Sequence, residues 1–269
     1  MVAKQFTKKA VTFILRYIIK DPLFIVYYGL AYFRKEYINE ALFIRDEKIA
    51  KDISKGKSFI RIGDGEVGLL HGRDIGYQKA DAELVEYLNK SIKEYDSRAP
   101  YILAIPIFVN HSNTDLVNRN VLRCWLPLKI EWRRIFNKKE KYADAHFFYY
   151  KNNFEKYLES YLKTKKLIIN TTKENIKKQQ VSIESIFNVE GWVEAQSPEP
   201  FDLFSQTKHQ IDELIKNYGG DKKDIVLILS SGPMSKALAY EYSRKGVQAL
   251  DIGKGFEHVY NNENFEHHI

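Results

Sequence analysis

The chain has 269 residues, of which 44% are hydrophobic and 29% are charged, so it is long enough to bury a substantial core. Its formal net charge of +7 favours an anionic partner, such as a nucleic acid, a phosphorylated small molecule or an anionic membrane surface. Cys124 is the only cysteine, which excludes an intrachain disulfide and a cysteine-rich zinc site and is typical of a reducing, cytoplasmic setting.

Residues 1–40 are predicted to form a helical extension ahead of a single domain over 41–269. The extension is rich in aromatic and aliphatic residues, but Arg16 and the Asp21-Pro22 pair interrupt it. No apolar run therefore approaches the roughly 20 residues of a membrane-spanning helix, and no secretory cleavage site is present. Two interpretations stay open: short helices that lie in a membrane interface, and a helical hairpin packed on the domain.

Strand-like and helical patterns alternate along the rest of the chain. Strands are predicted at 57–63, 101–109, 145–150, 165–170, 181–189, 224–232 and 247–253. Helices are predicted at 81–95, 152–162, 207–218 and 233–246. The alternation is typical of an α/β fold with a Rossmann-like, mostly parallel sheet flanked by helices, in which ligands usually bind beyond the carboxyl ends of the strands.

The clearest βαβ unit spans residues 224–253. A buried-strand run leads into Ser231 and Gly232, and Pro233 follows at a first-turn helix position where its missing N–H costs nothing. The free backbone N–H groups of such a helix start can bind a phosphate, and simple helix capping is the alternative.

The stretch "RIGDGEVG" at 61–68 matches the dinucleotide fingerprint G-x-G-x-x-G through Gly63, Gly65 and Gly68. It also carries Asp64 and Glu66, whose charges oppose a pyrophosphate. Two like charges about 4 Å apart repel by about 4 kcal/mol at an effective dielectric of about 20. Nicotinamide or flavin binding is therefore disfavoured.

A divalent cation would reconcile these two acids with a diphosphate. In an extended segment, residues two apart point to the same side, so Asp64 and Glu66 could hold one Mg²⁺ or Mn²⁺ while Gly65 leaves room for the ligand. Arg61 is a candidate anion contact beside them. The alternative is a pair of solvated loop acids.

Three blocks of the chain, in their order and spacing, resemble the GT-D fold glycosyltransferases, a bacterial family first catalogued as a domain of unknown function. The blocks are "FIRIGDGEVGLL" at 59–70, "NVEGW" at 188–192 with "FDLF" at 201–204, and "LSSGPMSKALAYEYSRKGVQALDIGKGFEHVY" at 229–260. The resemblance covers roughly residues 40–265.

The resemblance implies a hexosyltransferase that takes a sugar from a nucleoside diphosphate donor, typically a UDP-sugar such as UDP-glucose, with Mn²⁺ or Mg²⁺ at Asp64-Gly65-Glu66. Acceptors in the family are glycans, glycopeptides, glycoproteins or lipid-linked molecules in bacterial surface polysaccharide or glycoprotein synthesis. This implies a cytoplasmic enzyme, held peripherally at the inner face of the plasma membrane if the N-terminal extension binds lipid.

Two departures from the family pattern concern the donor and acceptor sites. The segment "EGWVEAQSPEPFDLF" keeps Asp202 but lacks the Arg and Asn that the family usually carries there. Lys254 stands where the family commonly has His.

The expected roles follow from this resemblance and from the strand ends. Asp64 and Glu66 are expected to hold the metal, which neutralises the diphosphate. The expected donor-binding residues are Arg61, Gly63, Gly65, Ser231, Gly232 and Lys254. The candidates for the base that activates the acceptor hydroxyl, chosen because they lie at or just beyond predicted strand ends, are Glu190, Asp251, Glu257 and His258.

Two other classes of protein stay open. A methyltransferase is one, because "RIGDGEVG" also resembles the Gly-rich loop that holds S-adenosylmethionine. A non-catalytic module that binds anions, nucleic acid or membrane is the other, suggested by the net charge of +7. The basic residues are dispersed and form no recognised nucleic-acid motif, so no nucleic-acid partner is expected.

Overall fold

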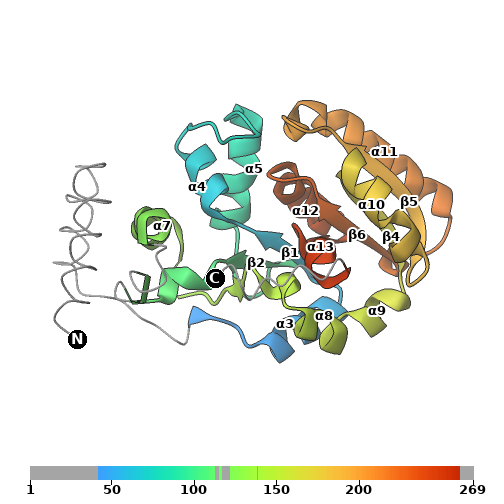
Figure 1. The fold of residues 1–269 in the computed structure, drawn as a ribbon, viewed down its shortest axis with the longest axis horizontal. Coiled ribbons are helices and arrows are strands. Elements are labelled where there is room, and N and C mark those ends of the chain that lie inside the picture. The colour runs from blue at the N-terminus through green and yellow to red at the C-terminus, as the bar shows by residue number, and fades with distance from the viewer. Residues whose placement is uncertain (1–41, 113–114, 117–121, 138, 261–269) are drawn as a thin grey trace, which may run out of the picture. The chain divides into compact units, whose positions relative to one another are not determined.

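A computed structural model describes residues 42–112, 115–116, 122–137 and 139–260 (Figure 1). The predicted helical extension over 1–40 lies outside the described residues. The described residues fall into two compact units, of which Phe108–Ile135 forms one and residues 42–107 with 136–260 form the other. The larger unit contains the sheet and every residue of the candidate site.

The larger unit is built on a seven-stranded parallel sheet with the order β3-β2-β1-β7-β6-β4-β5. Its strands are β1 (Ser58–Arg61), β2 (Tyr101–Ile105), β3 (Ala143–Asp144), β4 (Lys166–Thr172), β5 (Asn188–Ala195), β6 (Ile225–Ser230) and β7 (Gln248–Asp251). The predicted α/β class with a mostly parallel sheet is confirmed. Strands β1 and β7, the first and last in the described part of the chain, are neighbours in the middle of the sheet.

The helices of the larger unit are α3 (Asp46–Ser54), α4 (Asp64–Leu70), α5 (Ala82–Lys93), α8 (Lys151–Tyr157), α9 (Glu159–Lys163), α10 (Lys173–Glu184), α11 (Phe204–Tyr218), α12 (Met234–Arg244) and α13 (Gly255–Tyr260). Short 3₁₀ turns are η3 (Ile107–Asn110), η4 (Phe147–Tyr149), η5 (Pro200–Leu203) and η6 (Lys222–Asp224). Side-chain caps set some of the starts, as where Asp81 accepts hydrogen bonds from the N–H groups of Glu83 and Leu84. The smaller unit contains α7 (Leu122–Ile135).

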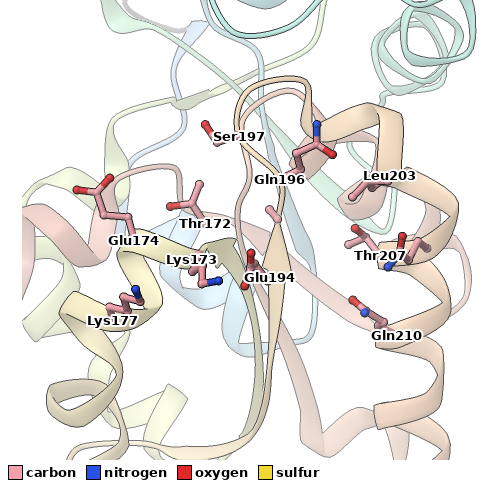
Figure 2. Close-up of a pocket in the computed structure, with 12 residues that line it drawn as sticks. Thr172, Lys173, Glu174, Lys177, Glu194, Gln196, Ser197, Leu203, Thr207 and Gln210 are labelled. Carbon is pink, nitrogen blue, oxygen red and sulfur yellow. The ribbon is translucent and has the colours of Figure 1, made fainter.

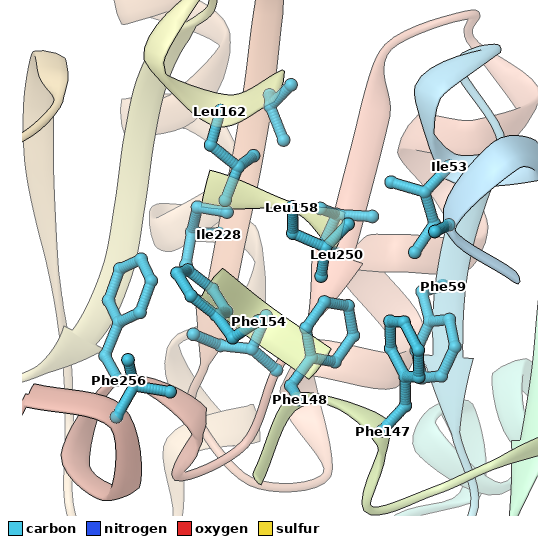
Figure 3. Close-up of a cluster of buried hydrophobic side chains, with 14 of the residues drawn as sticks. Ile53, Phe59, Phe147, Phe148, Phe154, Leu158, Leu162, Ile228, Leu250 and Phe256 are labelled. Carbon is cyan, nitrogen blue, oxygen red and sulfur yellow. The ribbon is translucent and has the colours of Figure 1, made fainter. Parts of the chain in front are cut away.

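Helices cover both faces of the sheet (Figure 1). Helix α12 packs on β1, β6 and β7, α5 packs on α12 and α4, and α11 packs on β5. On the other face lies the apolar cluster of Figure 3, which joins the sheet to α3, α8, α9, α13 and η4. Because strand side chains alternate, Leu250 and Ile252 join this cluster, whereas Asp251 faces α12.

The sequence pattern is wrong for two predicted strands. Residues 145–150 include η4, because Phe147 and Phe148 both pack into the cluster around Phe59, and adjacent strand residues would point to opposite faces. Only 188–189 of the predicted strand at 181–189 are extended, because α10 runs to Glu184 and β5 begins only at Asn188. The predicted helix over 152–162 divides into α8 and α9 at Leu158.

Among the described residues, no helix is both long enough and apolar enough to cross a bilayer.

Candidate active site

The segments singled out in the sequence meet at one edge of the sheet. Strands β1, β7 and β6 are adjacent, and all run in the same direction, so their carboxyl ends lie together. Arg61 ends β1, Asp251 ends β7, and Ser231 follows the end of β6. The three segments singled out in the sequence are therefore neighbours in space, and their role in ligand binding stays a prediction.

Four charged side chains form a compact cluster at this edge: Arg61, Glu66, Lys236 and Asp251. The Lys236 ammonium lies 3.3 Å from Glu66 Oε1 and 3.2 Å from Asp251 Oδ2. The backbone N–H of Arg61 donates to Asp251 Oδ2 at 3.3 Å. Glu66, Lys236 and Asp251 are 6%, 7% and 0% exposed, so these charges stabilise one another away from water.

The surroundings favour the charged forms of Glu66, Lys236 and Arg61. Burial alone would raise the pKa of Glu66, but the Lys236 charge and the Gly63 N–H outweigh it and lower that pKa. Burial alone would lower the pKa of Lys236, but the carboxylates of Asp251 and Glu66 raise it. Burial would also lower the pKa of Arg61, and Tyr149 and Asp251 raise it. Each charge thus depends on its partners.

Asp64 and Glu66 do not lie in an extended segment, and that part of the sequence interpretation is wrong. They are the first and third residues of α4, and Gly63 is its N-cap. The Gly63 N–H donates to Glu66 Oε2 at 2.7 Å, half of a capping box, and the helix dipole favours acids in a first turn. A helix start thus accounts for both acids.

This geometry does not fit a metal chelated by both acids. Residues two apart on a helix point about 200° apart, so Asp64 is exposed while Glu66 turns inward. The two Glu66 oxygens already face the Gly63 N–H and Lys236. In the described part of the chain, no group of three or more His, Cys, Asp or Glu side chains converges as a metal site. The metal at Asp64 and Glu66 stays a prediction.

Tyr149 connects Arg61 to the residues after β7. The Arg61 Nη2 donates to the Tyr149 hydroxyl at 2.9 Å, and the guanidinium lies 4.6 Å from the ring centroid. The Lys254 N–H donates to the same hydroxyl at 3.4 Å, and the His258 ring lies 4.6 Å from the Tyr149 ring. Two side chains and one backbone N–H, from the end of β1 and from the residues after β7, thus surround one phenol. The Nε of Arg61 is buried without a hydrogen-bond partner.

Gly253 makes this arrangement possible. Its φ is +53°, a value that residues with a Cβ rarely adopt, and a Cβ there would overlap the Arg61 guanidinium. The glycine therefore provides both the turn after β7 and the space for Arg61.

The turn before α12 is only partly open to a phosphate. Ser231 is 3% exposed, and its N–H donates to Ser235 Oγ at 2.8 Å. The backbone group expected to bind an anion at Ser231 is therefore already bonded. Gly232 has φ +61°, and its carbonyl accepts from Lys236 at 3.1 Å.

Tyr77 borders the site, and the sequence pattern gave no indication of it. Its side chain is 48% exposed. A Cβ on Gly232 would lie 3.0 Å from its ring, and one on Gly65 would lie 4.0 Å from its hydroxyl, so the ring passes close to both glycines. Burial of part of the side chain raises the pKa of Tyr77, and Glu66 raises it further.

The four candidate bases lie in different surroundings. Asp251 is fully buried and paired with Lys236. Glu257 and His258 belong to α13, where Glu257 Oε1 accepts a hydrogen bond from Asn175 at 3.0 Å and His258 lies against Tyr149. The structure thus places Glu257 and His258, but not Asp251, at partly exposed positions.

Glu190 is the exception, because it does not lie at the carboxyl end of a strand. It is the third residue of β5, at a bulge where Val189 pairs with Leu167 and Gly191 pairs with Ile168. The expectation fails because α10 delays the start of β5. Five further residues, about 16 Å of strand, separate Glu190 from the carboxyl end at Ala195.

A pocket of about 860 Å³ opens at the carboxyl ends of β4 and β5 (Figure 2). Figure 2 shows side chains of α10 on one side of it and side chains of α11 on the other. Its lining consists of Thr172, Lys173, Glu174, Lys177, Glu194, Ala195, Gln196, Ser197, Leu203, Gln206, Thr207 and Gln210. These hydroxyl, amide and charged groups suit a ligand with many hydrogen-bonding groups.

The sequence patterns missed Lys236 and Tyr149 as well as Tyr77. Lys236 had a detectable signal, because it is the one charged residue in the otherwise apolar or small run "MSKALAY" at 234–240, whose residues are all buried. Tyr149 had none, because its segment was predicted as a strand.

The chain was also compared with known protein families and solved structures. Residues 59–267 match the family model described as glycosyltransferase GT-D fold. The chain belongs to this family.

A curated relative is the glycosyltransferase GlyD of Streptococcus pneumoniae serotype 4 (strain ATCC BAA-334 / TIGR4), which is 25% identical over 231 residues. The match covers 77% of this chain but only 26% of GlyD. The chain thus spans about a quarter of that relative's length.

Solved structures share the GT-D fold. A glycosyltransferase (DUF1792) from Streptococcus sanguinis matches with a TM-score of 0.65 and 21% identity, over 82% of this chain and 83% of that one. A structure described as a highly conserved domain of unknown function with a distinct glycosyltransferase fold matches with a TM-score of 0.63 and 20% identity, over 85% and 82%. The Rossmann-like GT-D fold expected from the sequence is therefore confirmed.

The role of Gly253 can be tested by substitution. Gly246 also has a positive φ, of +74°, but a Cβ there would meet nothing within 4 Å. We expect Gly246→Ala to lower the free energy of unfolding by about 1–2 kcal/mol through backbone strain alone. Gly253→Ala should cost at least about 1 kcal/mol more, because it also displaces Arg61. Urea denaturation measures both, and equal losses would contradict the role assigned to Gly253.

The ionised state of Glu66 predicts a pH dependence of stability. Its pKa in the folded protein lies below the ordinary value of 4.5. Its contribution to stability is therefore present above that value and is lost as the pH falls through the folded-state pKa. In urea denaturation from about pH 6 to about pH 3, we expect Glu66→Gln to flatten the fall in stability. The exposed control Glu213→Gln should leave the fall unchanged, and the same result for Glu66→Gln would refute the prediction.

Proposed function

We propose that the chain transfers a sugar from a nucleoside diphosphate sugar, of the UDP-sugar class, to a hydroxyl group of a glycan, glycopeptide or lipid-linked acceptor. The observation that carries the proposal is the group formed by Arg61, Tyr149 and Lys254 at the carboxyl ends of β1 and β7. Arg61 and Lys254, two basic residues, meet the same Tyr149 hydroxyl through a guanidinium and a backbone N–H, at the edge of the sheet where ligands of this architecture usually bind, in a chain of the GT-D family.

Arg61 and Lys254 bind the diphosphate in this proposal. Lys254 is exposed just beyond β7, and Arg61 retains a buried Nε–H that no protein group accepts. Cations placed beside the leaving group stabilise the negative charge that develops as the bond to the anomeric carbon breaks. The requirement for a cation at this position explains why Arg61 is held from both sides by Tyr149 and Gly253.

Tyr77 and the pocket bind the uncharged parts of the substrates. The exposed ring of Tyr77 beside Gly65 and Gly232 offers a face for the base or the sugar of the donor. The polar pocket beyond β4 and β5 opens along the same edge of the sheet and suits the hydroxyl groups of a saccharide.

His258 is the base that the geometry favours, with Glu257 as the alternative. One turn of α13 links His258 to Lys254, since the His258 N–H donates to the Lys254 carbonyl at 3.1 Å. A base beside the diphosphate-binding residues can accept the proton of the attacking hydroxyl. Asp251 is enclosed in the charged cluster and Glu190 lies toward the other end of its strand, so neither is given this role. No step is assigned to a metal, because Asp64 and Glu66 diverge.

Donor binding provides the first test. We expect UDP to bind the wild-type protein in titration calorimetry, and Lys254→Ala or Arg61→Ala to weaken binding about tenfold or more, as expected for lost charge-assisted hydrogen bonds. Lys216→Ala removes an equal charge at the carboxyl end of α11, away from the site, and should leave the affinity unchanged. Equal effects of Lys254→Ala and Lys216→Ala would refute the assigned diphosphate site, and release of UDP from UDP-sugars with a saccharide acceptor tests the transfer itself.

The face of Tyr77 provides a second test. Stacking of an aromatic ring on a base contributes about 1–3 kcal/mol, so Tyr77→Ala should raise the Kd for UDP about fivefold to about 150-fold. Tyr77→Phe keeps the ring and should bind UDP like the wild type. A loss in Tyr77→Phe equal to that in Tyr77→Ala would contradict stacking.

A further inference from the structure

The ammonium of Lys236 lies among oxygens from three separate segments. Glu66 Oε1 of α4 lies 3.3 Å away, and Asp251 Oδ2 at the end of β7 lies 3.2 Å away. The carbonyl of Gly232, in the turn before α12, accepts a hydrogen bond from it at 3.1 Å. Two carboxylates and a carbonyl around one point are the ligand types that hard divalent cations take in proteins.

The geometry thus pairs Glu66 with Asp251 rather than with Asp64. Glu66 Oε2 is held by the Gly63 N–H, which leaves Oε1 directed at Lys236. Asp251 Oδ1 is buried and has no hydrogen-bond partner, so this carboxylate retains an unused ligand atom. A divalent ion shared by the two carboxylates would have to displace the ammonium.

Two properties make that displacement unfavourable. Lys236 is 7% exposed and is enclosed by the groups that it binds, so leaving would strand its charge in the interior. The Gly232 carbonyl also accepts a hydrogen bond from it at 3.1 Å, so the ammonium is bound on a third side as well. The position between Glu66 and Asp251 is therefore already filled by the Lys236 ammonium.

We propose that Lys236 is the resident cation of this site, and that it takes the place of a divalent metal ion between Glu66 and Asp251. The wild-type protein then binds no Mn²⁺ there. On the basis of the proposed function, we further infer that the protein binds a nucleoside diphosphate without a metal ion.

Removal of the lysine side chain tests this directly, because it leaves two buried carboxylates and a carbonyl with no cation. Mn²⁺ is titrated into the wild type and Lys236→Ala, and bound Mn²⁺ is measured by electron paramagnetic resonance and by the shift in Tm. We expect Lys236→Ala to bind one Mn²⁺ at least tenfold more tightly than the wild type, with a rise in Tm. Lys236→Ala combined with Glu66→Gln should lose this site, and the control Lys216→Ala should behave like the wild type.

Wild-type Mn²⁺ binding as tight as that of Lys236→Ala would overturn the proposal, and so would Lys236→Ala failing to bind Mn²⁺. If Lys236→Ala folds only when Mn²⁺ is added, that dependence itself supports the proposal. If it does not fold even with Mn²⁺, the binding of UDP to the wild type decides the question.

That measurement compares UDP binding to the wild type in EDTA and in Mn²⁺. Equal affinities support Lys236 as the resident cation, whereas UDP binding that requires Mn²⁺ overturns it. Absence of UDP binding under both conditions would refute the proposed function, while the Mn²⁺ titration of the variants would still test the cation site.

Discussion

The contact of the Lys236 ammonium with Glu66 and Asp251 is the interaction on which the candidate site depends. It joins the first turn of α4, the end of β7 and the first turns of α12, which are separated by up to 185 residues in the sequence. A buried charge without a partner is strongly destabilising, so none of these groups can leave alone. The ion pairs therefore fix the segments after β1, β6 and β7 relative to one another. These segments carry other polar groups of the site, whose positions depend on the same ion pairs.

Other groups around these ion pairs shape the rest of the site. Gly253 turns the chain sharply and leaves space for the Arg61 guanidinium, while Tyr149 binds that guanidinium and the Lys254 N–H. Arg61 and Lys254 thus lie at the carboxyl edge of the sheet, where the exposed ring of Tyr77 borders Gly65 and Gly232. Farther along the same edge, the polar pocket between α10 and α11 provides hydrogen-bonding groups without any aromatic side chain. In the proposed function, the basic residues after β1 and β7 bind the diphosphate, and the polar groups after β4 and β5 bind hydroxyl groups of a saccharide.

The sequence predicted the class of fold and the location of the site better than it predicted the contacts. Buried runs such as "IVLILS" and the small-residue turn after them identify strand ends without tertiary information. The direction of Glu66 could not be predicted, because "DGE" fits both an extended loop and a helix start, and the Gly63 N–H and Lys236 decide between them. Tyr149 lay in an aromatic run with strand propensity, and burial of Phe147 and Phe148 on the same side overrides that propensity. Long-range pairing of charges, as between residues 66, 236 and 251, has no local signature.

A double-mutant cycle on Glu66 and Lys236 tests the central claim most directly. The free energies of unfolding of the wild type, Glu66→Gln, Lys236→Met and the double variant are measured by urea denaturation at neutral pH. Because each single variant leaves a buried charge without its partner, the two losses should not add. We predict a coupling energy of about 1–3 kcal/mol, with the double variant more stable than the sum of the single losses implies. Additivity to within about 0.5 kcal/mol would contradict the claim that this ion pair holds the site together.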